Sequence, residues 1–186
     1  RFIQCYVAEQ NMINMAIGLE KTDKNVVAST FAAFLTRAFD QIRMAAISRS
    51  HLKICGSHAG VSVGSDGPSQ MGLEDIAIMR TIPNSIVLYP CDEFSTECLT
   101  KLMIEYNLGI SYLRTTREAT PKIYARENNF HIGGSSILVD NNDPAALIVT
   151  AGLPVHFALQ AINELKKHKL EINLIDAYSI KPIDYK

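Results

Sequence analysis

The chain lacks an excess of charge of either sign. Its 18 Lys and Arg residues are balanced by 19 Asp and Glu residues, which gives a formal net charge of −1 at pH 7. Proteins that bind nucleic acid or anionic membranes usually carry a basic surface. The balance therefore argues against nucleic-acid and membrane partners. With 47% hydrophobic and 20% charged residues in 186, the composition is that of an ordinary globular protein.

The sequence also lacks paired cysteines and long apolar runs. None of its four cysteines belongs to a C-x-x-C pair, and all lie in apolar or helical surroundings. Free thiols in a reducing cytosol, and hence a cytoplasmic protein, are the expectation. No apolar run reaches membrane-spanning length, and no charged-then-apolar leader is present. Because the chain begins without Met and ends without a closing element, we expect a piece of a longer protein.

What the sequence does contain is a regular alternation of short β-rich runs and helical periodicity. Asp92 is a candidate helix cap, as are Ser29 and Thr30. Such alternation predicts an α/β fold with a doubly wound, mostly parallel sheet. Strands are expected at 2–7, 25–29, 52–55, 85–89 and 109–113, and helices at 9–19, 29–48, 73–80 and 92–106.

A second α/β unit is predicted after a polar stretch. Strands at 135–139, 146–150 and 172–175 and a helix at 155–167 form its first βαβ elements. The predicted organisation is a domain at 1–118, a linker at 119–134 and a truncated second domain at 135–186.

The stretch 56–70 is the candidate binding loop. Its four glycines permit unusual backbone angles and close ligand approach, while His58, Asp66 and Gln70 supply polar groups. Within it, Gly-Val-Ser62-Val-Gly fits the nucleophile-elbow pattern, but the Ser-Asp-Gly-Pro that follows cannot open a helix tightly. A Ser62 hydrolase is therefore disfavoured, and the lone Gly152 is weak support for a dinucleotide site.

Several chemically capable residues follow predicted strands directly. Glu9, Phe31, the 56–70 loop and Arg117 all occupy such positions, so they could share the edge where parallel strands end. Each also has an ordinary structural explanation. Glu9 suits the start of any helix, and Phe31 with Phe34 could be a helical core pair. Asp66 could form a turn, and Arg117 could be a solvated surface charge.

Taken together, these segments resemble the transketolase family, and more narrowly the pyrimidine-binding domain of the animal-type enzyme. The resemblance runs through nearly the whole chain. Its motifs are Ala-Glu9-Gln-Asn, Ser-Thr-Phe31-Ala-Ala-Phe34, Gly-Ser-His58-Ala-Gly-Val, Asp66-Gly-Pro-Ser-Gln70 and Arg-Thr-Thr-Arg117.

The resemblance implies a site for thiamine diphosphate. Glu9 would be catalytic, hydrogen-bonding N1′ of the aminopyrimidine, and for this it must hold or share a proton near neutral pH. Phe34 would pack on the pyrimidine ring with Phe31 beside it, and Gln70 would also touch the cofactor. A divalent metal (Mg or Ca) and the diphosphate would be bound by an upstream domain that this chain does not contain.

The resemblance also implies sugar phosphate substrates. His58 and Asp66 would bind hydroxyls of the sugar donor, His58 would help to move protons, and Arg117 would grip the phosphate. The reaction would transfer a two-carbon ketol unit from a ketose phosphate to an aldose phosphate, in a homodimer. Arg37 stands where some family members have a third aromatic residue.

Two alternatives stay open from the sequence. One is another thiamine diphosphate enzyme, such as deoxyxylulose-phosphate synthase or a pyruvate dehydrogenase β subunit. The other is a non-catalytic transketolase-like protein that acts as a binding partner. The fragment alone is expected to be inactive.

Overall fold

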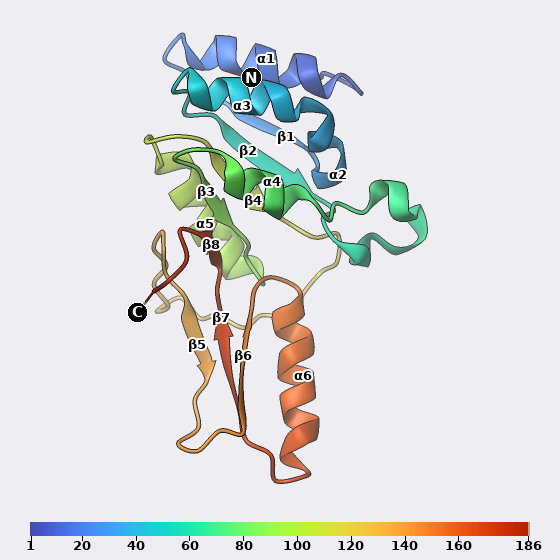
Figure 1. Cartoon of the computed structure of the whole chain (residues 1–186), viewed down its shortest axis with the longest axis vertical. Helices are drawn as coiled ribbons and strands as arrows, with labels where there is room; N and C mark the ends of the chain where they lie inside the picture. The colour runs from blue at the N-terminus through green and yellow to red at the C-terminus, as the bar shows by residue number, and fades with distance from the viewer. Residues whose placement is uncertain (186) are drawn as a thin grey trace.

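The computed structural model describes residues 1–185 (Figure 1). Lys186, the last residue of the predicted second domain, lies outside the described residues. The first part of the chain alternates helices and strands. Its elements are α1 (Glu9–Glu20), β1 (Val27–Phe31), α2 (Ala32–Leu35), the 3₁₀ helix η1 (Thr36–Ala38), α3 (Phe39–Ile47), β2 (Lys53–Ser57), η2 (Val61–Asp66), η3 (Pro68–Gln70), α4 (Asp75–Thr81), β3 (Ile86–Leu88), α5 (Glu93–Glu105) and β4 (Ser111–Arg114).

The first sheet is mostly parallel, as predicted. Its strand order is β1-β2-β4-β3-β8, and only β8 (Ser179–Lys181) runs antiparallel to its neighbour. In the register of the sheet, Gly56 lies opposite Thr30 on one side and Arg114 on the other. The carboxyl ends of β1, β2 and β4 therefore meet at one edge, where ligands of such sheets bind.

Helices cover both faces of this sheet, which confirms the doubly wound fold. Alternate strand residues point to opposite faces. Tyr112 and Val87 belong to a core shared with α1, α3 and α4, whereas Leu113 and Leu88 belong to a core shared with α5. Figure 1 shows α1 and α3 together at one end of the molecule. No helix within residues 1–185 is long and apolar enough to cross a membrane.

The second unit has a three-stranded sheet of order β5-β7-β6. Its strands β6 (Ala146–Thr150) and β7 (Ile172–Asp176) are parallel and joined by α6 (Pro154–Lys166), whereas β5 (Ser136–Val139) is antiparallel to β7. The core of this unit is continuous with the core beneath α5.

The segment 119–134 has no helix or strand, but two of its aromatic residues are buried in the core beneath α5. Tyr124 and Phe130 pack edge-to-face, and Phe130 packs in the same way on Tyr178. The Asp92 side chain caps α5 as predicted, and its other oxygen accepts hydrogen bonds from the Ile123 and Tyr124 amides at 2.8 Å each. The segment is therefore anchored to the first unit.

Two expectations for the N-terminal third were wrong. Residues 2–7 form no strand, and Phe2, Tyr6 and Val7 are each more than 80% exposed. An apolar run becomes a strand only when a neighbouring strand satisfies its backbone groups, and within the described sheet β1 pairs only with β2.

The helix expected at 29–48 is broken into three pieces and starts later. Ser29 and Thr30 pair with β2 as part of β1, so they do not cap a helix. Phe31 is the last residue of β1 and precedes α2 directly, so Phe31 and Phe34 do not lie on one helix. Pairing with β2 along Val27–Phe31 overrode the local helical pattern.

Candidate active site

Glu9 begins α1 and is buried, with 4% of its surface exposed. Its carboxylate accepts hydrogen bonds from Arg37 Nη1 at 3.2 Å to Oε1 and 3.1 Å to Oε2. An acidic side chain in the first turn complements the helix dipole. Here the carboxylate also has a cationic partner from η1, a contact that the sequence did not predict.

Next to this ion pair lies a stack of three rings. The guanidinium carbon of Arg37 lies 4.6 Å from the Phe34 ring centroid. Phe34 and Phe31 are stacked with centroids 5.5 Å apart and an interplanar angle of 2°. The His58 ring stacks on Phe31 at 3.9 Å and 12°. The structure therefore joins Glu9 to His58 through an unbroken series of contacts.

The position of His58 depends on the end of β2. The residue follows Ser57 directly and has a φ of 54°, an angle that few non-glycine residues adopt. Its Nδ1 lies 3.1 Å from Ser57 Oγ. Such backbone angles persist where surrounding contacts hold them, and they cluster at functional sites. The turn places the His58 ring against the end of β1.

Asp66 and Arg117 form a second, more open group. Arg117 Nη1 donates to Asp66 Oδ1 at 3.1 Å and to the Val63 carbonyl at 3.0 Å. The two side chains are 46% and 37% exposed. Arg117 thus lies on the binding loop with one carboxylate partner and with access to solvent, so its remaining donors are free to meet an anionic ligand.

The structure does not join every predicted residue. Gln70 ends η3, and its side chain makes no hydrogen bond to any part of residues 1–185. Within the same described residues, no hydrogen bond, ion pair or ring contact connects the Asp66–Arg117 pair with the ring stack. Ser62 Oγ is buried without a described hydrogen-bond partner. Within residues 1–185, the structure therefore places no hydrogen-bonding base on Ser62 Oγ.

Sequence reasoning missed a buried polar cluster beneath the loop. Arg114 Nε donates to Asp75 Oδ2 at 2.8 Å, and the Tyr112 hydroxyl donates to the same oxygen at 2.7 Å. Burial and then the Asp75 carboxylate raise the pKa of Tyr112 well above its usual value, so its hydroxyl stays a donor. Burial opposes the charge on Arg114, but Asp75 together with Tyr89 and Tyr112 outweighs it, so the Arg114 pKa is raised. The Arg-Thr-Thr-Arg run contains both Arg114 and Arg117, and only the second was predicted as a site residue.

Residues 1–185 contain no group of three or more His, Cys, Asp or Glu side chains that could hold a metal ion. Parallel ring faces beside a buried carboxylate do fit a flat heterocycle that presents a ring nitrogen to Glu9. The described residues thus offer an aromatic face and a buried carboxylate to a flat ligand.

Family models match both units of the chain. Residues 1–122 match "Transketolase, pyrimidine binding domain", and residues 135–186 match "Transketolase, C-terminal domain". The chain belongs to the transketolase family.

Individual relatives agree with this assignment. The chain is 48% identical to mouse transketolase over 187 residues, covering 100% of this chain and 30% of that protein. It is also 48% identical to mouse transketolase-like protein 2, covering 99% of this chain and 29% of that protein. It is similar to a solved structure described as "Split gene transketolase, inactive beta4 tetramer", with a TM-score of 0.84, 34% identity, and coverage of 95% of this chain and 57% of that one. The chain therefore spans about a third or less of the curated relatives it matches.

Proposed function

We propose that this chain is part of an enzyme that transfers a two-carbon ketol unit from a ketose phosphate to an aldose phosphate with thiamine diphosphate. The observation that carries the proposal is the buried Glu9 carboxylate beside the parallel rings of Phe34, Phe31 and His58. Similarity to transketolases along the whole chain supports it.

In this proposal, residues of this chain bind and position the aminopyrimidine half of the cofactor. Phe34 packs on the aminopyrimidine ring with Phe31 beside it, which excludes water from that face, and Gln70 also contacts the cofactor. Glu9 hydrogen-bonds N1′ and holds the proton there. When bound, thiamine diphosphate supplies a nucleophilic carbon that carries the two-carbon unit. For Glu9 to hydrogen-bond N1′, Arg37 must give up at least one of its two hydrogen bonds to Glu9, because it now donates to both carboxylate oxygens.

The sugar phosphate lies along the loop. His58 binds and orients hydroxyls next to the ring stack and moves protons between them, a task suited to imidazole. Asp66 binds a further hydroxyl. Arg117 holds the phosphate, because its forked donors match phosphate oxygens and its exposed side is open to solvent.

The remainder of the site belongs to a longer protein in this proposal. Thiamine diphosphate needs groups for its diphosphate and a divalent metal, Mg or Ca, and a separate domain would supply them. The related split-gene structure is described as an inactive β4 tetramer, which supports the need for a further part. We propose domains at 1–118 and 135–186 with a connection at 119–134, a homodimer in the whole enzyme, and a cytoplasmic location.

A second candidate is a transketolase-like protein without catalysis, because a transketolase-like relative is as similar as a transketolase. The full-length protein decides between them when it is assayed for ketol transfer with thiamine diphosphate and a divalent metal. Transfer between sugar phosphates supports the enzyme, and no transfer with folded, cofactor-loaded protein supports the binding protein. Turnover on pyruvate in place of ketose phosphates would instead indicate another thiamine diphosphate enzyme. Residues 1–186 alone should show no transfer.

A further inference from the structure

The binding loop closes at a narrow neck. The Gly60 amide donates to the Gly72 carbonyl at 2.9 Å, and the Ala59 amide donates to the Thr115 carbonyl at 3.0 Å. An isolated backbone bridge also pairs Ala59 with Gly72. His58 lies directly before this neck, and Asp66 lies inside the loop that the neck closes. The geometry of the neck therefore determines where both side chains can reach.

A buried ion pair supports the neck from below. Arg114 Nη2 donates to the Gly72 carbonyl at 3.2 Å, while its Nε donates to Asp75 at 2.8 Å. Asp75 is fully buried and Arg114 is 7% exposed. The Gly72 carbonyl thus accepts hydrogen bonds from the opposite side of the loop, at Gly60, and from the sheet, at Arg114.

Two glycines make room for this support. A Cβ at Gly56 would lie 2.1 Å from the Tyr112 hydroxyl, the group that crosses β2 to reach Asp75. A Cβ at Gly72 would lie 2.7 Å from Ala32 Cβ at the start of α2. The neck therefore packs directly against the helix that carries Phe34, and any shift of Gly72 changes the spacing between loop and ring stack.

We propose that Asp75 and Arg114 are positioning residues that hold the neck of the binding loop and thereby fix where His58 and Asp66 lie relative to the Phe31 and Phe34 rings. Neither side chain is exposed enough to meet a substrate, so both act through the loop. The inference rests on the proposed function for its catalytic consequence, whereas the placement of the neck itself can be measured without substrate.

The contacts of Arg114 require a guanidinium group. Its guanidinium uses two nitrogens at once, one for Asp75 and one for Gly72, and its Cζ atom lies 4.5 Å from the Tyr89 ring centroid. A lysine has one compact ammonium, so it cannot reproduce both hydrogen bonds and the cation–π contact together. Arg114→Lys keeps the charge while weakening the neck.

The test uses Arg114→Lys and Asp75→Asn in the full-length protein. The matched controls are Arg43→Lys and Asp40→Asn, which alter an exposed ion pair of 2.7 Å between neighbouring turns at α3. Amide hydrogen exchange of the segment 56–72 in the absence of substrate should accelerate by about 10-fold or more in Arg114→Lys, because lost support lets the neck open locally. Exchange in β6 and β7 should not change.

Steady-state kinetics distinguish a positioning effect from a general loss of structure. KM for the ketose phosphate should rise by about 10-fold in Arg114→Lys while kcat falls less, the pattern of weakened ground-state binding. Unchanged exchange and unchanged KM would overturn the proposal, as would acceleration throughout the protein. If Asp75→Asn does not fold, Arg114→Lys still decides. If the wild-type protein transfers no ketol unit, the proposed function fails, whereas the exchange experiment still tests the neck.

Discussion

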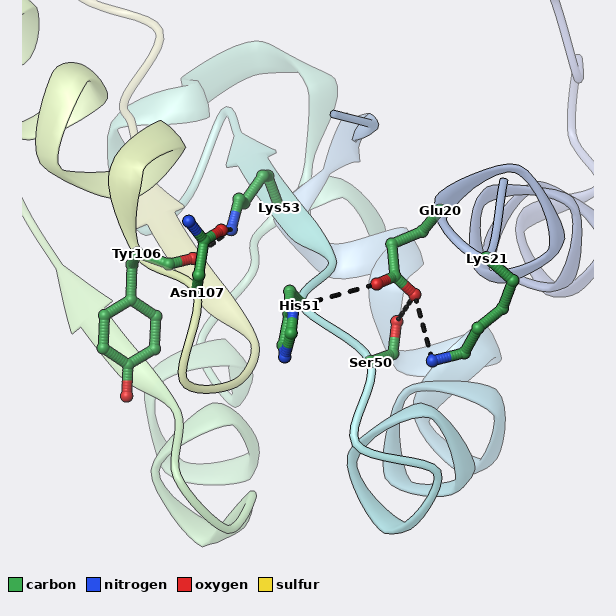
Figure 2. Close-up of polar contacts among 7 residues, drawn as sticks. All are labelled: Glu20, Lys21, Ser50, His51, Lys53, Tyr106 and Asn107. Carbon is green, nitrogen blue, oxygen red and sulfur yellow. Dashed lines mark hydrogen bonds and ion pairs between the residues drawn. The ribbon is translucent and has the colours of Figure 1, made fainter. Parts of the chain in front are cut away.

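The two ends of α1 each carry a glutamate, and they lie at opposite edges of the first sheet. Glu9, at the edge where the parallel strands end, is 4% exposed and pairs with Arg37, which is distant in the sequence. Glu20, at the edge where the strands begin, is bonded by Ser50 at 2.9 Å and lies 3.5 Å from Lys21 and 3.9 Å from His51 (Figure 2).

At the edge where the strands begin, polar side chains are hydrogen-bonded to nearby groups of the protein itself. Figure 2 shows Lys53, the first residue of β2, directed toward the loop before β4. Its ammonium donates to the Tyr106 carbonyl and lies 3.4 Å from Asn107 Oδ1. Burial lowers the pKa of Lys53, although Glu20 partly counteracts this. These contacts close short connections between elements.

At the opposite edge, where the strands end, polar side chains are exposed to solvent. Asp66 and Arg117 keep over a third of their side chains exposed, and His58 is held in a rare backbone conformation. Short loops whose polar groups are hydrogen-bonded within the protein favour stability. Long loops with exposed polar groups favour ligand binding. We therefore propose that the edge where the strands begin stabilises the fold and that the opposite edge binds the ligand.

Replacing the two glutamates tests this division with the largest expected effect. Glu9→Gln in the full-length enzyme should lower kcat for ketol transfer by at least about 100-fold, because the amide cannot hold the proton at N1′. Glu20→Gln, on the same helix, should leave kcat within about 2-fold, since Glu20 faces Ser50 and not the site. Equal losses in both variants would contradict the division.

Arg117 provides the next test, on substrate binding. Arg117→Ala should raise KM for a ketose phosphate by about 10- to 100-fold, because charge-assisted hydrogen bonds to the phosphate are lost. KM for the unphosphorylated ketose should stay nearly constant. Arg126→Ala, at another exposed arginine, serves as the control. An equal KM rise on both ketoses would show that Arg117 does not bind phosphate.

Lys53 tests the structural edge. Lys53→Met should lower the free energy of unfolding by about 1–3 kcal/mol, because the part-buried Tyr106 carbonyl loses its donor. kcat/KM should remain within about 2-fold. Urea unfolding and ketol-transfer kinetics measure the two effects. Lys101→Met, at an exposed pair on α5, should change neither quantity. A large activity loss with unchanged stability would reverse the assignment of the edges.

The smallest effect concerns pH. Burial raises the pKa of Glu20, but hydrogen bonds from Ser50 and the His51 amide, together with Lys21, outweigh it, so the folded pKa lies below the ordinary 4.5. A depressed carboxylate pKa stabilises the fold above pH 4.5 and loses that contribution as pH falls through the folded pKa.

The wild type should therefore exceed Glu20→Gln in unfolding free energy by less than about 1 kcal/mol near pH 6, and this difference should shrink as the pH is lowered from 6 through the folded pKa of Glu20. Urea unfolding across this range measures the difference. A difference that stays constant with pH would mean that the Glu20 charge contributes nothing.

Much of the fold was predictable because the signals were local. The Asp92 cap and the helical period before Glu105 locate α5, and the apolar run before Tyr89 locates β3. The strands at 146–150 and 172–176 also came close to their expected bounds. Strand 2–7 failed because a strand needs a partner, and β8 was missed because three residues give no period.

The candidate site was likewise predictable only where the signals were local. Motif spacing predicted Glu9, His58 and Arg117 at strand ends. β2 and β4 do end directly before His58 and a few residues before Arg117, but residues 2–7 before Glu9 form no strand. The contacts of Arg37 and Arg114 were not predictable, since an arginine's partner can lie dozens of residues away. Periodicity reports which face a residue occupies, and it does not report which distant group shares that face.

The sequence by itself determined the family, the mostly parallel sheet and the residue types of the site. Those properties follow from local periodicity, glycine placement and motif order, all of which are written along the chain. Only the tertiary structure decided that Phe31 ends a strand, that Arg37 holds Glu9, and that Asp75 and Arg114 support the loop neck. Each depends on side chains that meet across strand register and helix packing, where burial and pairing outweigh local preference.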